Sequence, residues 1–160
     1  MVSCWKSLGA SAGTASLLCG VLLFTPLIGT VAFPADLNAA ADSVLGDAIS
    51  QTESLMESMG HGCSGGPNGV APVNWGALQS HGNSAVTALN AARVALENQN
   101  KPGAIQQINS AEGELDALVN GAHYNCAGGA HGVDPVGFDG YLAIKAAVKG
   151  QLDVVKRFLS

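Results

Sequence analysis

Apolar and small residues recur every three or four positions in four stretches of the chain, and this spacing predicts four helices that each carry one apolar face. The predicted helices cover 37–59, 74–98, 102–122 and 140–159. In the first helix the apolar or small positions are Ala41, Leu45, Ala48, Thr52, Leu55 and Met59. In the last they are Tyr141, Ile144, Val148, Leu152, Val155 and Leu159. Four such helices bury their faces together as a bundle, so we expect an all-α, antiparallel up-down-up-down four-helix bundle over 33–160.

The expected helix ends follow from glycine, proline and capping residues. Gly60 ends the first helix, and Asn74 and Asp139 are the expected N-caps of the second and fourth helices. The second and third helices are joined by a short turn at 98–101, after which Pro102 is tolerated in the first helical turn.

Two parts of the sequence resemble each other at an offset of 63 residues. Residues 63–75 and 126–138 share seven identities in thirteen positions, including the glycines and the Val-x-Pro-Val ending. The register continues into the helices, where Leu45 matches Ile108 and Leu89 matches Leu152. We therefore expect two duplicated helix-loop-helix units, at about 37–99 and 100–160.

The topology predicts a disulfide between Cys63 and Cys126. In an up-down-up-down bundle the first and third connections lie at the same end, so the two cysteine-containing loops meet there. Two cysteines at equivalent places in an exported domain are typical of one disulfide, with Cα atoms within about 7 Å.

The N-terminal segment predicts export. Lys6 is the only charged residue before Asp36, and 17–28 has the apolar character of a signal h-region. Thr30-Val31-Ala32 offers small residues at the two specificity positions before a cleavage site. We therefore expect a signal peptide at 1–32 that is cleaved after Ala32, and a periplasmic or extracellular protein. The alternative is an uncleaved membrane anchor, because the uncharged stretch is long enough to span a bilayer.

The charge of the mature chain limits its partners. After Ala32 the chain contains six Lys or Arg and twelve Asp or Glu, which gives a formal charge of −6. Nucleic acids and anionic lipids attract basic surfaces, so we expect neither nucleic-acid binding nor membrane binding after cleavage.

One group of side chains at the loop end predicts a metal site, and a second predicts a ligand pocket. Imidazoles and thioethers suit copper, and imidazoles alone suit zinc. The candidate metal ligands are His61, His81, His123, His131 and Met59, and the candidate pocket residues are Trp75, Phe138, Tyr124 and Tyr141. Against the metal site, no histidine recurs at the offset of 63.

Catalytic motifs are weak. The Gly-rich loops lack the Lys-Ser/Thr ending of a phosphate-binding loop, and no Cys-x-x-Cys-His motif for covalent haem occurs. Ser64 near histidines is the only candidate nucleophile, and the carboxylate pairs at four-residue spacing suit solvated helix faces. We therefore expect an exported, non-enzymatic bundle without a cofactor that binds a protein partner or a small ligand at the disulfide-tied loop end. The alternative is a periplasmic copper- or zinc-binding protein.

Overall fold

The computed structural model describes residues 33–63, 69–127 and 132–160, and within them the protein is all-helical. The helices are α1 (Phe33–Met59), α2 (Trp75–Glu97), α3 (Lys101–Ala122) and α4 (Phe138–Leu159). The described residues contain no strand, and one isolated β-bridge joins Cys126 to Val133. The four helices belong to one compact unit, Ala32–Ser160.

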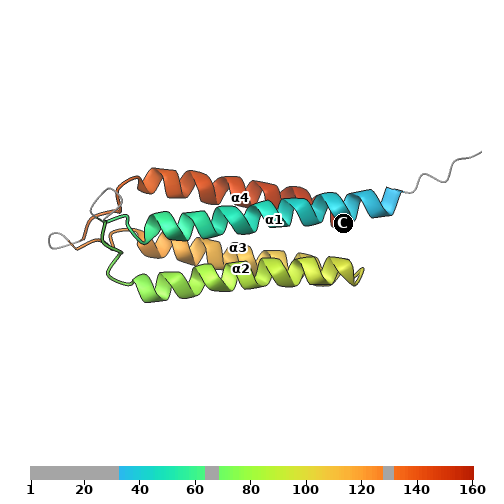
Figure 1. Ribbon diagram of the computed structural model, residues 1–160, viewed down its shortest axis with the longest axis horizontal. Coiled ribbons are helices and arrows are strands. Elements are labelled where there is room, and N and C mark those ends of the chain that lie inside the picture. Colours follow the sequence, from blue (N-terminus) through green and yellow to red (C-terminus); the bar gives the residue numbers. More distant parts are fainter. Residues whose placement is uncertain (1–32, 64–68, 128–131) are drawn as a thin grey trace, which may run out of the picture. The chain divides into compact units, whose positions relative to one another are not determined.

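Consecutive helices run antiparallel, and the two long connections lie at the same end of the bundle (Figure 1). Each helix packs against its neighbours in sequence, and α4 closes the bundle against α1. The short turn between α2 and α3 lies at the opposite end (Figure 1). This arrangement confirms the predicted four-helix bundle. Among the described residues, no helix is both long and apolar enough to cross a membrane. The predicted signal segment at 1–32 lies outside them.

The apolar faces form the core as the periodicity predicts. All six predicted positions of α1 are fully buried, and the buried positions of α3 follow them at an offset of 63. The buried positions of α3 at this offset are Ala104, Ile108, Ala111, Leu115, Leu118 and Ala122. Five buried positions of α2 match α4 in the same way: Leu78, Ala85, Leu89, Ala92 and Leu96 correspond to Tyr141, Val148, Leu152, Val155 and Leu159. At these eleven core positions the two halves therefore have matching burial.

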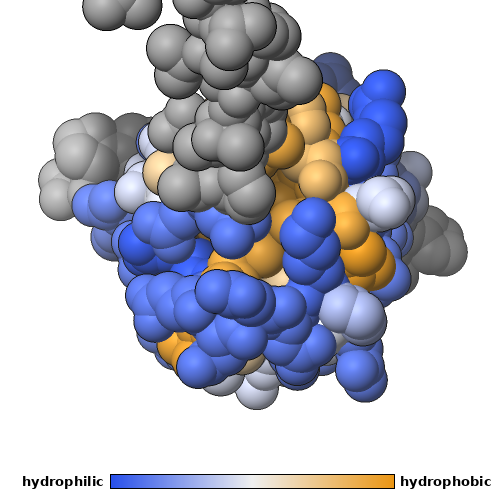
Figure 2. All heavy atoms as spheres, turned by 90° about the vertical axis from the view of Figure 1, so that its right-hand side faces the viewer, coloured by the Kyte–Doolittle hydropathy of each residue, from blue (hydrophilic) through white to orange (hydrophobic). Residues whose placement is uncertain are grey.

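Many core positions are alanine, which allows close approach of the helices, especially of α2 and α3. Figure 2 views the end opposite the long loops, where apolar surface is visible between the helix ends. Leu37 and Phe158, which are 41% and 45% exposed, are large apolar residues of the terminal turns at this end.

Of the two predicted N-caps, Asn74 is confirmed in position and Asp139 was wrong. The N-cap of α4 is Gly137, with φ of 78°, and Asp139 lies inside the first turn. Asn74 occupies the N-cap position of α2, but its side chain makes no capping hydrogen bond. It donates instead to the Gly121 carbonyl of α3, at 3.0 Å. Asn100 is the residue that caps a helix through its side chain, since it accepts from Gly103 N at the start of α3.

Candidate functional site at the loop end

The two long loops are closed by the same internal hydrogen bond. Cys63 N donates to Val70 O at 2.9 Å, and Cys126 N donates to Val133 O at 3.0 Å. Both bonds span seven residues, and the four residues are equivalent at the offset of 63. Each cysteine is therefore held at the base of a tight loop.

The loops also bind each other in a reciprocal way. Val73 N donates to Asn125 O at 2.8 Å, and Val136 N donates to Gly62 O at 2.7 Å. Because Val73 is equivalent to Val136 and Gly62 to Asn125, each loop makes the same contact with the other. The predicted Cys63–Cys126 disulfide is confirmed, with the two Cα atoms 5.1 Å apart. This disulfide is compatible with an oxidising, exported compartment.

The C-terminal end of α3 is stabilised by two amide side chains from these segments. Asn74 Nδ2 and Asn125 Nδ2 both donate to Gly121 O, at 3.0 Å and 2.9 Å. A carbonyl in the last helical turn has no intrahelical partner, so these bonds satisfy it. The bond from Asn74 holds the start of α2 against the C-terminal end of α3.

The described histidines bind three different partners. His61 Nδ1 lies 3.3 Å from Gly69 O, and His81 Nδ1 lies 2.7 Å from Glu114 Oε2 on α3. His123 Nδ1 lies 2.7 Å from Asp134 Oδ1. Among the residues that the structure describes, no group of three or more His, Cys, Asp or Glu side chains is placed to hold a metal ion.

The two remaining predicted metal ligands are Met59 and His131. Met59 is fully buried in the loop-end core. His131 lies outside the described residues, as does the candidate nucleophile Ser64.

The four predicted pocket aromatics separate into two groups. Phe138 contacts Tyr141 edge-on at 6.3 Å and stacks on His123 at 5.1 Å, and the His123 ring also contacts Tyr124 at 3.8 Å. Tyr141 is buried and donates its hydroxyl to Ser58 O at 3.1 Å, and burial raises the pKa of this hydroxyl. Trp75 lies on the α2 side of the same core end.

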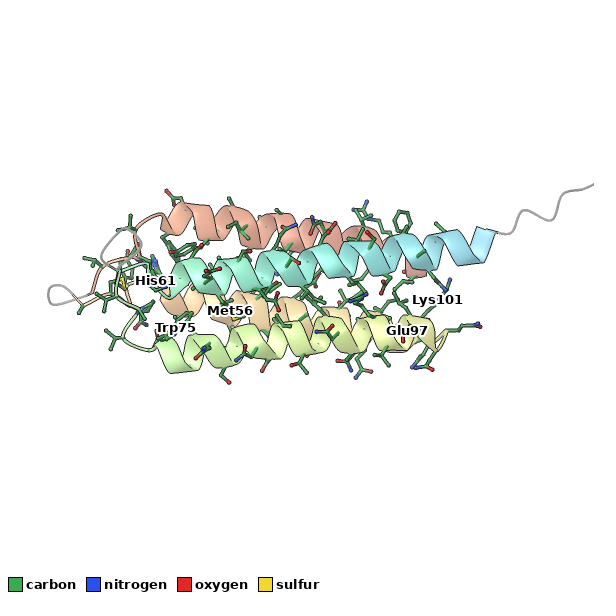
Figure 3. The ribbon with its side chains drawn as sticks, in the orientation of Figure 1. Met56, His61, Trp75, Glu97 and Lys101 are labelled. Carbon is green, nitrogen blue, oxygen red and sulfur yellow. A yellow bond between two sulfur atoms is a disulfide. The ribbon has the colours of Figure 1, made fainter. Side chains whose placement is uncertain are left out.

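A groove lies beside Trp75, between α1 and α2. Its volume is about 270 Å³, and it is lined by Met56, Glu57, Gly60, His61, Trp75, Gln79 and Asn83. Figure 3 shows Met56, His61 and Trp75 together toward the loop end, whereas Glu97 and Lys101 mark the far end. The groove therefore combines an aromatic ring, a thioether, an imidazole and a carboxylate.

Four exposed valines lie on the two long loops. Val70 and Val133 are 64% and 47% exposed, and Val73 and Val136 are 75% and 63% exposed. Tyr124 beside them is 58% exposed. We call these four valines the valine surface. Sequence reasoning assigned them to loop structure, although the repeated Gly-Val-x-Pro-Val motif was the signal that marked them.

A larger groove of about 560 Å³ runs along α2 and α3. It is lined by uncharged residues: Gly76, Gln79, Ser80, Asn83, Ser84, Thr87, Ala88, Ala91, Gln107 and Ser110. It contains no aromatic or ionisable side chain, so its chemistry favours no ligand class.

Two carboxylates of α3, Glu112 and Asp116, are bound to lysines of α4. Lys149 Nζ lies 2.6 Å from Asp116 Oδ2, and Lys156 Nζ lies 2.8 Å from Glu112 Oε1. The hydrogen bond from Lys149 lowers the pKa of Asp116 below its usual range. Burial disfavours the charge of Lys156, but the hydrogen bonds that its ammonium donates to Glu112 and Asp153 raise its pKa overall.

Comparisons with protein-family models, with curated proteins and with solved structures gave no match.

Proposed function

We propose that this protein is an exported, non-enzymatic binding protein whose binding surface is the loop end. The observation that carries this proposal is the valine surface. Four large aliphatic side chains, at 47% to 75% exposure, stand on two loops that are tied by a disulfide and by reciprocal hydrogen bonds. Exposed apolar side chains on a preorganised scaffold favour association, because little conformational freedom is lost on binding.

A protein partner suits the valine surface better than a membrane does. The formal charge of −6 on the mature chain opposes approach to an anionic lipid surface. A partner with an apolar patch would cover the valines without this penalty. A small ligand suits the groove beside Trp75 instead.

Site-specific crosslinking tests the protein partner. A photoreactive amino acid placed at Val73 or at Val136, in cells that export the protein, should yield the same heavier adduct. Val94 is the matched control, since it is 54% exposed but lies near the far end of α2. Replacing Val70 and Val133 by serine should remove the adduct. Absence of an adduct at both loop positions, or an equal adduct at Val94, would contradict the proposal.

We also infer that 1–32 is a signal peptide and that the bundle consists of two duplicated units. The disulfide supports an exported location. The matched burial and matched loop hydrogen bonds at an offset of 63 support duplication. The mass of the exported protein tests the cleavage site, since it should correspond to a chain that begins at Phe33.

Copper or zinc binding has less support. His61, His81 and His123 have separate partners, and Met59 is buried. Titration of the mature protein with each metal decides the question: stoichiometric binding that a His61→Ala, His123→Ala variant loses would favour the metal function.

A further inference from the structure

The two halves of the bundle differ at the groove, and the difference is one ammonium group. The positions equivalent to Glu53, Glu57 and Gly82 in the second half are Asp116, Asn120 and Lys145. Lys145 Nζ lies 3.0 Å from Asn120 Oδ1 and 3.4 Å from Asp116 Oδ1. The second half therefore places its own ammonium group against the two side chains that correspond to Glu53 and Glu57.

The first half retains the acceptors and lacks the ammonium group. Gly82 has no side chain, whereas Glu53 and Glu57 carry carboxylates on one exposed face of α1. Among the described residues, neither carboxylate has an ion-pair partner. The single Lys or Arg of α1 and α2 is Arg93, which binds Asp42 through two hydrogen bonds of 2.6 Å and 2.9 Å.

The walls of the groove are set by glycines. A Cβ built on Gly82 would overlap Met56 Sδ, and a Cβ built on Gly60 would lie 3.2 Å from Trp75 Cζ2. Met56 and Trp75 therefore pack directly on glycine backbone. In the second half the position of Gly60 is taken by His123, whose ring stacks on Phe138, the equivalent of Trp75.

We propose that this groove binds a primary alkylammonium group. The ammonium would bond to Glu57, with Glu53 one turn away, and the alkyl stem would lie against Met56 and the Trp75 ring. A metal ion fits less well, because Met56 Sδ is occupied in packing on Gly82 and the volume of about 270 Å³ exceeds that of an ion. The ammonium group can belong to a free amine or to a lysine side chain of a partner.

The inference is independent of the valine surface, since it rests on side chains of α1 and α2. The fluorescence of Trp75 reports directly on binding in the groove, because Trp75 is the only tryptophan after residue 32. The probes are n-pentylamine, the neutral analogue 1-pentanol and Nα-acetyl-lysine amide. Ligands of this size bind with a Kd of about 1 mM when they fit.

Titration of the mature protein, followed by Trp75 fluorescence, should show saturable binding of pentylamine and at least about tenfold weaker binding of pentanol. Glu57→Gln should weaken amine binding by at least about tenfold, whereas Glu97→Gln at the far end of α2 should leave it unchanged. Tighter binding of the lysine derivative would indicate a partner's lysine as the source, and tighter binding of pentylamine would indicate a free amine.

A second variant gives the first half of the bundle the residues of the second half, in which Lys145 supplies the ammonium group. Met56→Val with Gly82→Lys reproduces Val119 and Lys145, so it supplies the ammonium group internally and should abolish amine binding while far-ultraviolet circular dichroism stays helical. Three results would each overturn the proposal: equal binding of pentanol and pentylamine, unchanged binding in Glu57→Gln, or unchanged binding in the folded double variant. Lack of any saturable amine binding would do so as well.

Discussion

Glycines decide which side chains are accessible at the loop end. Trp75 packs on Gly60, whereas the equivalent Phe138 stacks on His123. A large ring thus faces glycine in one half, and a smaller ring faces an imidazole in the other. Because protein interiors are closely packed, such paired changes conserve volume while changing the exposed chemistry.

At the same scale, two glycines with positive φ allow a controlled test of the second loop. Gly132 and Gly137 have φ of 69° and 78°. A Cβ on Gly132 would overlap the carbonyl oxygen of Tyr124, whereas a Cβ on Gly137 would meet nothing within 4 Å. Gly137→Ala should therefore cost about 1 kcal/mol of unfolding free energy, from backbone conformation alone. Gly132→Ala should cost at least about 2 kcal/mol, because backbone must also move.

Denaturant unfolding of both variants measures these costs. Equal costs would show that the Tyr124 carbonyl does not restrict Gly132.

Single residues were the part of the structure that sequence reasoning predicted least well. Asn74 and Asp139 have the right chemistry for caps, but Asn74 bonds to α3 instead, and α4 begins one residue before Asp139. The sequence predicts that the histidines lie near the loop end. Their partners depend on which helix faces pack together, and the periodicity of one helix does not show this. Only direct comparison of Gly82 with Lys145, across the offset of 63, would have marked the groove.

At the scale of elements, α3 and α4 are joined by ion pairs across their surface. Asp116 receives Lys149 at 2.6 Å and Lys145 at 3.4 Å. The hydrogen bond from Lys149 lowers the pKa of Asp116, so the carboxylate is stabilised in the folded state. This contribution is present above the unfolded pKa of about 3.9 and is lost as the pH falls through the lower, folded pKa.

Asp116→Asn should therefore lower the free energy of unfolding at pH 7 by at most about 1 kcal/mol, because the pair is partly exposed. The difference from the wild type should be smaller at pH 2, because this contribution is lost as the pH falls through the folded pKa. Thermal unfolding at both pH values measures this change. Asp47→Asn, on the exposed face of α1, is the control and should change little. A difference that persists unchanged at pH 2 would exclude the ionic explanation.

The helices themselves were predictable, because their apolar period fixes both the type of element and the buried face. The ends of the helices were less predictable. α1 begins at Phe33 rather than at Leu37, and α2 and α4 begin one residue later and two residues earlier than expected. Local periodicity carries no information on where tertiary contacts end a helix.

At the scale of the whole molecule, the disulfide joins the two halves at one end of a thin, alanine-rich core. It joins Cys63 to Cys126, which are 63 positions apart in the sequence. In the chain-entropy model such a bond contributes roughly 3 to 4 kcal/mol.

Cys63→Ala with Cys126→Ala should lower the unfolding free energy by this amount while the helices form. Chemical denaturation measures the loss, and reduced wild-type protein should match the variant. A loss below about 1 kcal/mol would show that the helices alone hold the loop end.

We propose that the two halves of the bundle share one scaffold, and that the first half presents an open amine site where Lys145 closes the equivalent site of the second half. Amide chemical shifts of isotopically labelled mature protein, recorded during a titration with pentylamine, test this difference between the halves. We expect saturable shifts confined to 53–61 and 75–83, with none at the equivalent positions 116–124 and 138–146. Shifts of equal size in both halves, or shifts centred elsewhere on the bundle, would contradict it.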